Sequence, residues 1–542
     1  MLRCSVALAL AVGLLAPIVE ASSPKLVVLI AVDQLRRDRL DATLPGGLGR
    51  IVREGHVFSD AVLDHAMTET CAGHVTMLTG RHPGPSGIVG NTYIDVETGA
   101  RRYCVEDHAV DAAVLGGGDD PEDGRSPRNL RVDTLGDWLK AADPEARVFS
   151  VAAKDRSAIT LGGRRPDGAY WMIREGAPIF TTSRYYRGEL PEWVEAFNRA
   201  DGGGLVSRVP SHWTHATEPL PGRHQRLDDF PGESDERSRV SPHPLHAASD
   251  EDFADNLYAS PYVDDLTLAF ARTLVEQEGL GDRDHPDVLA IALAGTDTVG
   301  HAYGPGSLEA RDALLRLDAS LGELLAFLES RVGEGRLLVA LTADHGVLPL
   351  PEWLEATGAL ECPVEGGRQG LISFILRLEI KLHLALSPFS WPGFWVHAAS
   401  QLTVNRQRAA DWGIPIERVV AVAEQWLEEQ PAVREAWTRR EIARGKDDFA
   451  RLYRNSFDPQ RSGDLAIQLE PTCLLDFQGA GTTHGSPYDY DRNVPIVFFG
   501  SGIAAGSTPG PAATVDIAPT LAARIGLVPP SGLDGRNLLP AD

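Results

Sequence analysis

Several short apolar runs, each followed within a few positions by polar or charged residues, limit the folds open to this chain. The first run, LVVLIAV at Leu26–Val32, contains no polar residue and ends directly at Asp33. Continuous, largely β-branched runs of this length are typical of strands that are buried on both faces of a sheet. Comparable runs occur at Val148–Ala152, Val288–Leu293, Leu337–Leu341 and Pro495–Phe499.

Helical patterns stand between these runs. An amphipathic helix is expected from Leu308 to Leu328, with Ser307 as its N-cap, because leucines recur on one face. Other helices are expected at Gly46–Glu54, Leu266–Glu278 and Ile517–Ile525. The alternation of strands with helices predicts an α/β fold, with a doubly wound, mostly parallel sheet and helices on both faces.

Two stretches interrupt this alternation. Residues 161–282 are aromatic, turn-rich and uneven, and residues 350–480 include an apolar run from Phe374 to Trp395. That run contains charged side chains and two prolines, which favours a core or cap segment over a membrane span. We therefore expect core sections at 24–160, 283–349 and 481–542, a cap insert at 161–282 and a second insert at 350–480.

The first 21 residues, MLRCSVALALAVGLLAPIVEA, have the basic start, short apolar run and small-residue end of a secretory signal peptide. The mature protein is therefore expected to be secreted or periplasmic, without a membrane anchor after cleavage. Removal of residues 1–21 also removes Cys4. The four remaining cysteines allow one or two disulfides, but the sequence does not give their pairing; they are Cys71, Cys104, Cys362 and Cys473.

The charge balance argues against two classes of partner. The chain has 51 basic and 76 acidic residues and a formal net charge of −25. A protein that follows nucleic acid or an anionic membrane by its bulk charge would carry the opposite sign. An anionic small molecule must then be held by local cations. No internal repeat or heptad run is present, and a monomer is favoured.

Residues 65–91, HAMTETCAGHVTMLTGRHPGPSGIVGN, combine a hydroxyl group, a short helix and a polar turn. A helix over Ala72–Leu78, ending at Gly80, would leave Thr70 just before its N-terminus. The first N–H groups of a helix attract anions, and the turn that follows could bring Asn91 back to the same point. Thr70 is also a favoured helix cap, and Cys71 is a second candidate nucleophile, so this segment alone leaves the nucleophile open.

Carboxylates and imidazoles follow most of the predicted strands, and a doubly wound sheet gathers these strand ends at one edge. Zinc takes Asp oxygen and His nitrogen as ligands, so the set suits two zinc ions. A single Asp–His pair at a strand end is more often a structural, hydrogen-bonded pair, but the whole set converging without metal would leave buried charge unpaired. The residues are Asp33, Asp297, His301, Asp344, His345 and His484.

Two cations, Lys154 and Arg156, follow the strand at Val148–Ala152. They form either a surface pair or a clamp for phosphate. A phosphate monoester carries a second negative charge on its transferred group that a diester lacks, so two cations aimed at the nonbridging oxygens would favour monoesters.

The motifs together resemble those of a known family. TETCAGH around Thr70, KDRSAI around Lys154, GTDTVGH, TADHG and TTHG are similar to the successive motifs of the single-chain, threonine-dependent alkaline phosphatases of the alkaline phosphatase superfamily. The nucleotide pyrophosphatase/phosphodiesterases share most of these motifs, but not usually KDR. The resemblance runs from about Val27 to Leu539 and is weakest in the inserts. Ser86 departs from it, at a position where many relatives carry a His that is not a metal ligand.

The resemblance implies a role for each site residue and a zinc-dependent enzyme that hydrolyses small-molecule phosphate monoesters. Thr70 would be the nucleophile and form a phosphothreonine intermediate. Asn91 would contact a phosphoryl oxygen, beside Lys154 and Arg156. One zinc ion would be held by Asp297, His301 and His484, and the other by Asp33, Asp344, His345 and the Thr70 oxygen.

Three alternatives remain on the sequence. A phosphodiesterase or nucleotide pyrophosphatase could use the same two-zinc site. A sulfatase matures a cysteine or serine in a Cys-x-Pro-x-Arg context, whereas Cys71 is followed by Ala72, Gly73 and His74. A secreted phosphate-binding or adhesion protein on a degenerate scaffold would be expected to lack a ligand, but none of the ligand positions carries a non-ligating residue.

Overall fold

A computed structural model describes most of the chain. The described residues are 23–116, 124–215, 226–234, 236–386, 393, 395–398, 400–476 and 479–539. The predicted signal peptide, residues 1–21, lies outside them.

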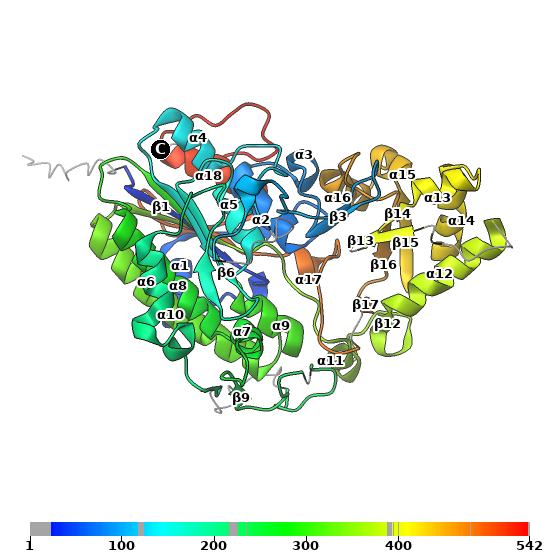
Figure 1. Ribbon diagram of the computed structural model, residues 1–542, viewed down its shortest axis with the longest axis horizontal. Coiled ribbons are helices and arrows are strands. Elements are labelled where there is room, and N and C mark those ends of the chain that lie inside the picture. Colours follow the sequence, from blue (N-terminus) through cyan, green and yellow to red (C-terminus); the bar gives the residue numbers. More distant parts are fainter. Residues whose placement is uncertain are drawn as a thin grey trace, which may run out of the picture.

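A nine-stranded sheet forms the centre of the described structure (Figure 1). Five neighbouring strands, from β11 to β6, run parallel to one another, while β18 is antiparallel to both its neighbours and β7 is antiparallel to β6. In spatial order the strands are β19 (Gly506–Ala513), β2 (His56–Val62), β18 (Ile496–Gly500), β11 (Leu337–Thr342), β1 (Leu26–Val32), β10 (Asp287–Leu293), β5 (Val148–Ala152), β6 (Gly168–Ile173) and β7 (Ile179–Thr181). The predicted α/β class with a mostly parallel sheet is confirmed.

Helices cover both faces of this sheet, and β1 shows why. Its side chains alternate between two apolar cores, with Val28 and Ile30 in one and Val27 and Leu29 in the other. A strand that is buried on both faces is therefore expected to be a nearly continuous apolar run rather than an alternating one. The helices of the first face are α1 (Gly47–Glu54), α6 (Glu192–Arg199), α7 (Asp250–Tyr258), α8 (Tyr262–Glu278) and α10 (Leu308–Val332), and those of the second are α2 (Thr70–Thr79), α4 (Leu135–Ala142), α5 (Asp155–Gly162) and α18 (Ile517–Arg524).

The expected helices are present with small shifts at their ends. Ser307 caps α10, because its side chain accepts a hydrogen bond from the Ala310 N–H at 3.0 Å. Gly80 ends α2 in the left-handed conformation, with φ of 65°. Helix α2 begins at Thr70 rather than at Ala72, so Thr70 is its first residue.

The expected boundary of the cap insert is wrong. Residues 161–282 were expected to lie outside the core, but β6 and β7 are strands of the central sheet and α8 packs into its core. The irregular segment, as far as the structure describes it, comprises residues 200–215, 226–234 and 236–249, with 3₁₀ turns and the paired two-residue strands β8 (His212–Trp213) and β9 (His243–Pro244).

The second insert forms a lobe with its own sheet and core, at the right in Figure 1. The apolar run that begins at Phe374 lies largely in α12, and Phe374, Leu378 and Leu382 are buried against α14. The lobe contains α12 (Leu371–Leu386), α13 (Arg406–Asp411), α14 (Ile416–Glu428), α15 (Arg439–Arg444), α16 (Asp448–Ser456) and a sheet in the order β13 (Trp395–Ala398), β14 (Gln401–Val404), β16 (Leu465–Leu469), β15 (Val433–Thr438).

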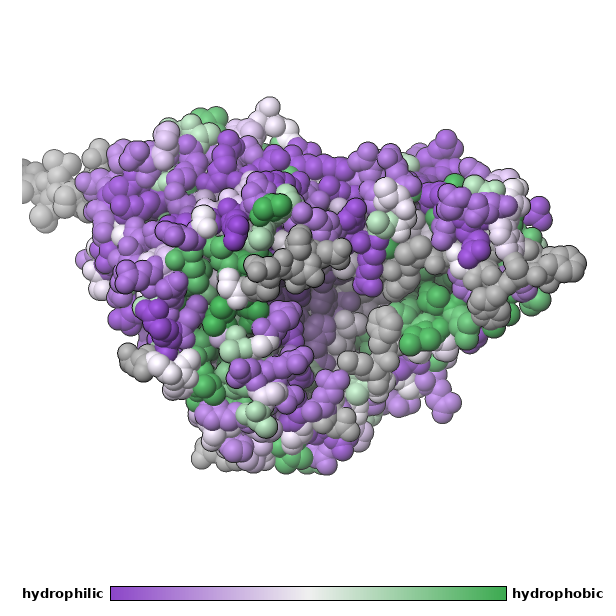
Figure 2. Space-filling model, in the orientation of Figure 1, coloured by the Kyte–Doolittle hydropathy of each residue, from purple (hydrophilic) through white to green (hydrophobic). Residues whose placement is uncertain are grey.

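The surface is hollowed between this lobe and the central α/β unit (Figure 2). Short elements complete the described chain: α3 (Pro83–Ser86), β3 (Thr92–Ile94), β4 (Arg101–Tyr103), α9 (Gly295–Tyr303), α11 (Pro351–Thr357), β12 (Arg368–Gly370), β17 (Leu474–Asp476) and α17 (Asp489–Arg492). Within the described residues, no helix combines the length and the apolar character that a bilayer crossing requires.

Candidate active site

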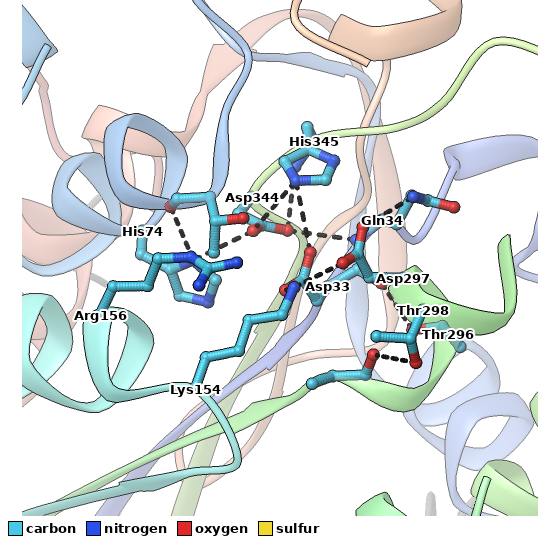
Figure 3. Close-up of polar contacts among 12 residues, drawn as sticks. Asp33, Gln34, His74, Lys154, Arg156, Thr296, Asp297, Thr298, Asp344 and His345 are labelled. Atoms are coloured by element: carbon cyan, nitrogen blue, oxygen red, sulfur yellow. Dashed lines mark hydrogen bonds and ion pairs between the residues drawn. The ribbon is translucent and has the colours of Figure 1, made fainter. Parts of the chain in front are cut away.

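The carboxyl ends of four adjacent parallel strands carry the charged residues of the site (Figure 3). Asp33 follows β1, Asp344 follows β11, and Lys154 follows β5. Asp297 lies in the first turn of α9, which begins just after β10. Because these strands are neighbours and parallel, their ends meet at one edge of the sheet, where open α/β folds build their sites.

Two groups of potential metal ligands form at this edge. In each group the ligand atoms lie within 4.8 Å of one another. His345 belongs to both groups, and its ring stacks on that of His484 with 3.4 Å between the ring centres. The groups are Asp33, Asp344 and His345, and Asp297, His345 and His484.

His301 lies beside the second group. Its Nε2 is 3.1 Å from Oδ1 of Asp297, one helical turn earlier on α9. The structure therefore brings all six predicted ligand residues to one place, although His345 rather than His301 completes the tightest cluster around Asp297.

The three histidines are held in the orientation that a metal ligand needs. Each Nδ1 contacts a backbone carbonyl oxygen: Gly346 at 2.9 Å for His345, Thr482 at 2.7 Å for His301 and Thr68 at 2.6 Å for His484. A carbonyl oxygen only accepts hydrogen bonds, so Nδ1 must carry the proton. In the neutral ring this leaves Nε2 bare, and such carbonyl contacts commonly fix the tautomer of metal-bound histidines.

The charge of the site also fits a metal. Burial, together with the nearby charges of Asp297 and Asp344, raises the pKa of the Asp33 carboxyl well above its usual value. Nζ of Lys154 lies 2.5 Å from both Asp33 and Asp297 and offsets part of this charge. Among the described residues, the buried atoms Oδ1 of Asp33 and Nε2 of His345 have no hydrogen-bond partner. Bare nitrogen and carboxylate oxygens facing one another fit a bound cation.

Thr70 is tied to the ligand residues through the backbone around it. Its carbonyl oxygen is 2.9 Å from Nδ1 of His74, and that nitrogen is 3.1 Å from Oδ2 of Asp344. Two residues earlier, the Thr68 carbonyl contacts His484. The start of α2 is thereby fixed between the two ligand groups.

Asn91 returns to the start of α2, as expected from the turn before it. Its side-chain oxygen accepts a hydrogen bond from the Cys71 N–H at 2.9 Å, and its own N–H donates to Oε2 of Glu69 at 2.7 Å. The side-chain oxygen of Asn91 therefore bonds to the start of α2. Its side-chain N–H groups can donate to another partner.

The cysteine pairing, which the sequence left open, is Cys71 with Cys104 and Cys362 with Cys473. Cys71 is therefore bonded to another sulfur and does not offer a thiol beside Thr70. The first disulfide closes the loop that contains Asn91.

Lys154 and Arg156 reach toward the carboxylates from the same side (Figure 3). Arg156 lies in the first turn of α5, next to Asp155, whose carboxylate accepts hydrogen bonds from Tyr103 at 2.6 Å and Arg125 at 2.7 Å. These contacts anchor the turn. The Nε atom of Arg156 is buried and has no hydrogen-bond partner in the described part of the chain, so the pair does not form a simple surface feature.

Three site residues were missed in the sequence. His74 bridges Thr70 and Asp344, and Glu69 holds Asn91. Gln34, at a left-handed φ of 67°, donates from its backbone to Asp344 at 3.2 Å and from its side chain to Asp297 at 2.7 Å. His74 could have been found, because it lies four residues after Thr70 and therefore on the same face of the helix.

The fold and site define an α/β protein with paired metal-ligand groups at the carboxyl edge of its sheet, and comparisons with known proteins give its family. Residues 27–486 match the model of the type I phosphodiesterase / nucleotide pyrophosphatase family. The chain therefore belongs to this family.

Three curated relatives match nearly the whole chain. Alkaline phosphatase PhoK of Sphingomonas sp. is 35% identical, covering 96% of this chain and 92% of its own. Alkaline phosphatase PafA of Elizabethkingia meningoseptica is 30% identical, covering 95% and 94%. A protein of Myroides odoratus named calcium-transporting ATPase is 31% identical, covering 96% and 95%.

Comparison with solved structures places this chain with the same relatives. The crystal structure of wild-type alkaline phosphatase PafA matches with a TM-score of 0.87 and 29% identity, covering 95% of this chain and 98% of that one. Murine ectonucleotide pyrophosphatase/phosphodiesterase 5 matches with a TM-score of 0.50 and 11% identity, a likeness of fold alone. The predicted resemblance to the threonine-dependent alkaline phosphatases, close to the nucleotide pyrophosphatase/phosphodiesterases, is confirmed.

Proposed function

We propose that this chain is a zinc-dependent alkaline phosphatase that hydrolyses phosphate monoesters through a covalent phosphothreonine intermediate. The observation that carries the proposal is the position of Thr70 at the N-terminus of α2, fixed between two groups of carboxylate and imidazole ligands. The names of two relatives that match nearly the whole chain, PhoK and PafA, support the same activity.

Zinc is the metal that suits these ligands best. The mixture of Asp oxygen and His Nε2 matches zinc rather than calcium or magnesium, which prefer oxygen alone. One ion would be held by Asp33, Asp344, His345 and the Thr70 oxygen, and the other by Asp297, His301 and His484. Bound zinc would supply a lowered pKa for hydroxyl groups and positive charge at the reacting oxygens.

The chain's own residues then account for a two-step displacement. The Thr70 oxygen attacks phosphorus and the alcohol departs, leaving a phosphothreonine; water displaces phosphate from Thr70 in the second step. The amide of Asn91 and the cations of Lys154 and Arg156 hold the nonbridging oxygens. The N–H groups at the start of α2 add partial positive charge. Because the attack requires a deprotonated Thr70, the rate rises toward alkaline pH.

Phosphodiester hydrolysis is the second candidate. The family model is named for phosphodiesterases and nucleotide pyrophosphatases, and the same paired ligands serve both reactions. Lys154 and Arg156 favour the monoester, because its transferred group carries one more negative charge than that of a diester.

The remaining features of the proposal concern partners and location. The substrates are small phosphate monoesters, the protein acts as a monomer, and it works outside the cytoplasm after its signal peptide is removed. The two disulfides support an oxidising compartment.

Zinc content measured together with hydrolysis of p-nitrophenyl phosphate tests the proposal. The purified chain is expected to hold two zinc ions at the sheet edge and to turn over the substrate. His484→Ala is expected to lose one ion and most of the activity. A protein that binds zinc and phosphate but shows no turnover would be a binding protein instead.

A further inference from the structure

A separate cluster of metal-type ligands lies where the irregular segment near residues 200–249 packs against the first turn of α10. Its core is His215, Asp228 and Glu309, and each residue offers one ligand atom within 4.8 Å of the others. His243 of β9 contacts the same glutamate. This region is at the lower edge of Figure 1, around β9.

Two histidines face the same carboxylate. Nε2 of His215 is 2.7 Å from Oδ1 of Asp228 and 3.6 Å from Oε1 of Glu309. Nε2 of His243 is 3.3 Å from that same Glu309 oxygen. Each carboxylate therefore faces an imidazole nitrogen, and the four residues come from the irregular segment and from the first turn of α10.

The second ring nitrogen of His243 indicates its tautomer. Nδ1 lies 3.2 Å from the Ser238 carbonyl oxygen, which only accepts, and the Tyr303 hydroxyl donates to that same carbonyl at 3.0 Å. Nδ1 therefore carries the proton of a neutral ring, and Nε2 is bare. A bare nitrogen facing a carboxylate oxygen repels it unless a cation or a second proton lies between them.

Glu309 is the residue that most needs a cation. Its side chain is 1% exposed, and within the described residues its Oε2 atom has no hydrogen-bond partner. An ionised carboxylate that is buried with one oxygen unpaired is costly.

A buried cation in this neighbourhood, Arg226, is already engaged. Arg226 donates to Glu233 at 2.7 Å and to the Tyr303 carbonyl. Burial, opposed by Arg226 and reinforced by the charge of Glu309, raises the pKa of Glu233 to about 8. The hydrogen bonds of Arg226 therefore go to Glu233 and to the Tyr303 carbonyl, and the raised pKa of Glu233 shows that this neighbourhood disfavours a further buried negative charge.

We propose that this cluster binds a structural Zn²⁺ ion. Its ligands would be Nε2 of His215, a carboxylate oxygen each of Asp228 and Glu309, and Nε2 of His243 as the fourth. Mixed imidazole and carboxylate ligands suit zinc, and a closed four-ligand set is typical of structural sites. The two carboxylates would balance the charge of the ion.

The ion would fasten the irregular segment to the corner between α9 and α10. The Tyr303 hydroxyl, at the end of α9, is 3.2 Å from Nδ1 of His243, and the same helix carries Asp297 and His301. The described part of this segment is held by turns and by the two-residue pair of β8 and β9 rather than by long elements, so a metal would add to its local stability.

Zinc counting and anomalous diffraction test the proposal on the full-length chain. The protein is equilibrated with micromolar buffered zinc, its zinc is measured by mass spectrometry, and crystals are measured on both sides of the zinc absorption edge. We expect an anomalous peak enclosed by His215, Asp228 and Glu309. Glu309→Gln is expected to remove this peak and to lower the zinc content by one ion per chain, while the peaks at the sheet edge remain.

Matched variants separate metal loss from misfolding. Glu323→Gln makes the same change at an exposed position of the same helix, and it is expected to leave the zinc count unchanged. Asp228→Asn changes the rim of the cluster, where the side chain is 31% exposed, and it is expected to lose the ion even if Glu309→Gln does not fold. No peak at micromolar zinc, a peak at millimolar zinc only, or an unchanged zinc count in Asp228→Asn would overturn the proposal.

Discussion

Thr70 is the single residue on which the proposed chemistry depends. Its main-chain neighbours contact ligand residues on both sides, through Thr68 to His484 and through His74 to Asp344. We predict that Thr70→Ala lowers kcat for p-nitrophenyl phosphate by about 10³-fold or more, because the attacking oxygen is removed. Thr70→Ser keeps an oxygen at this position and is expected to retain far more activity. A Thr70→Ala protein of undiminished rate would remove the covalent mechanism.

Lys154 and Arg156 carry the proposed preference for monoesters. Replacing both with Ala is predicted to lower kcat/KM for a monoester by about 100-fold or more, since each of the two charge-assisted hydrogen bonds contributes about 1.5 to 3 kcal/mol. The diester rate is expected to fall less. Lys140→Ala with Arg164→Ala removes the same charge from two surface ion pairs and serves as the control. An equal loss of kcat/KM for the monoester and the diester would assign Lys154 and Arg156 a structural role. Zinc analysis of the variant shows whether the loss of activity comes from a loss of metal.

His65 gives the protein a defined sensitivity to acid. The ring is completely buried, and burial lowers the pKa of His65 to about 3. The unfolded chain therefore binds a proton below about pH 6.5 that the folded chain does not, and stability falls as the pH drops from about 6.5 to 3, by roughly 5 kcal/mol in total. His65→Phe is predicted to reduce this acid loss in denaturant titrations at several pH values. His285→Phe, at an exposed histidine, should leave it unchanged; an unaltered acid loss in His65→Phe would contradict the assignment.

A site residue could be predicted from the sequence when both its chemical type and its position in the chain pointed to the site. Most of the ligand residues follow apolar strands, and Asn91 follows a turn that could fold back, so both were expected from the sequence. Gln34 and Glu69 were not, because an amide and a carboxylate of this kind are common at surfaces and only the tertiary contacts to Asp297 and Asn91 distinguish them. The disulfide pairing likewise depends on which loops meet in space.

At the scale of elements, the contact between α2 and the loop after β11 positions Thr70. A methyl group at Gly73 would lie 2.0 Å from the backbone oxygen of Asp344. Alanine gains about 1 kcal/mol over glycine in a helix, but overpacking costs about 1 to 3 kcal/mol, and a backbone atom cannot rotate away. The clash therefore outweighs the gain in propensity.

Gly73→Ala is accordingly predicted to lower both Tm and kcat, by displacing the start of α2 from Asp344. Gly188→Ala is the control, because a methyl group there meets nothing within 4 Å. Thermal unfolding and hydrolysis assays on the two variants check this; a stabilised, fully active Gly73→Ala would show that helix propensity dominates.

Strands and helices with a clear apolar pattern were predicted best from the sequence. Strands β1, β5, β10 and β11 are continuous apolar runs and were expected within one residue at each end. Strand β19, with the sequence GSTPGPAA, is rich in proline and glycine and mostly exposed, so its pairing with β2 depends on tertiary structure. The boundary at residue 161 failed because β6 and β7 lie in sequence that resembles the irregular segment after them.

At the scale of the whole molecule, the insert lobe has an apolar core of its own and also packs on the central α/β unit beside the site. The lobe has its own apolar core, and Leu452 and Tyr453 of α16 pack with Met67, three residues before Thr70. The hollow between the two parts (Figure 2) is where a leaving group of variable size could be accommodated. The lobe, rather than the sheet edge, is therefore the part in which differences in substrate are expected among relatives.

The central claim is that this sheet edge hydrolyses phosphate monoesters in preference to diesters. The most direct measurement compares kcat/KM for p-nitrophenyl phosphate and bis-p-nitrophenyl phosphate on protein whose zinc content has been determined. The account predicts a clearly higher value for the monoester at two zinc ions per site. An equal or higher value for the diester on fully loaded protein would contradict it and place the chain with the phosphodiesterases.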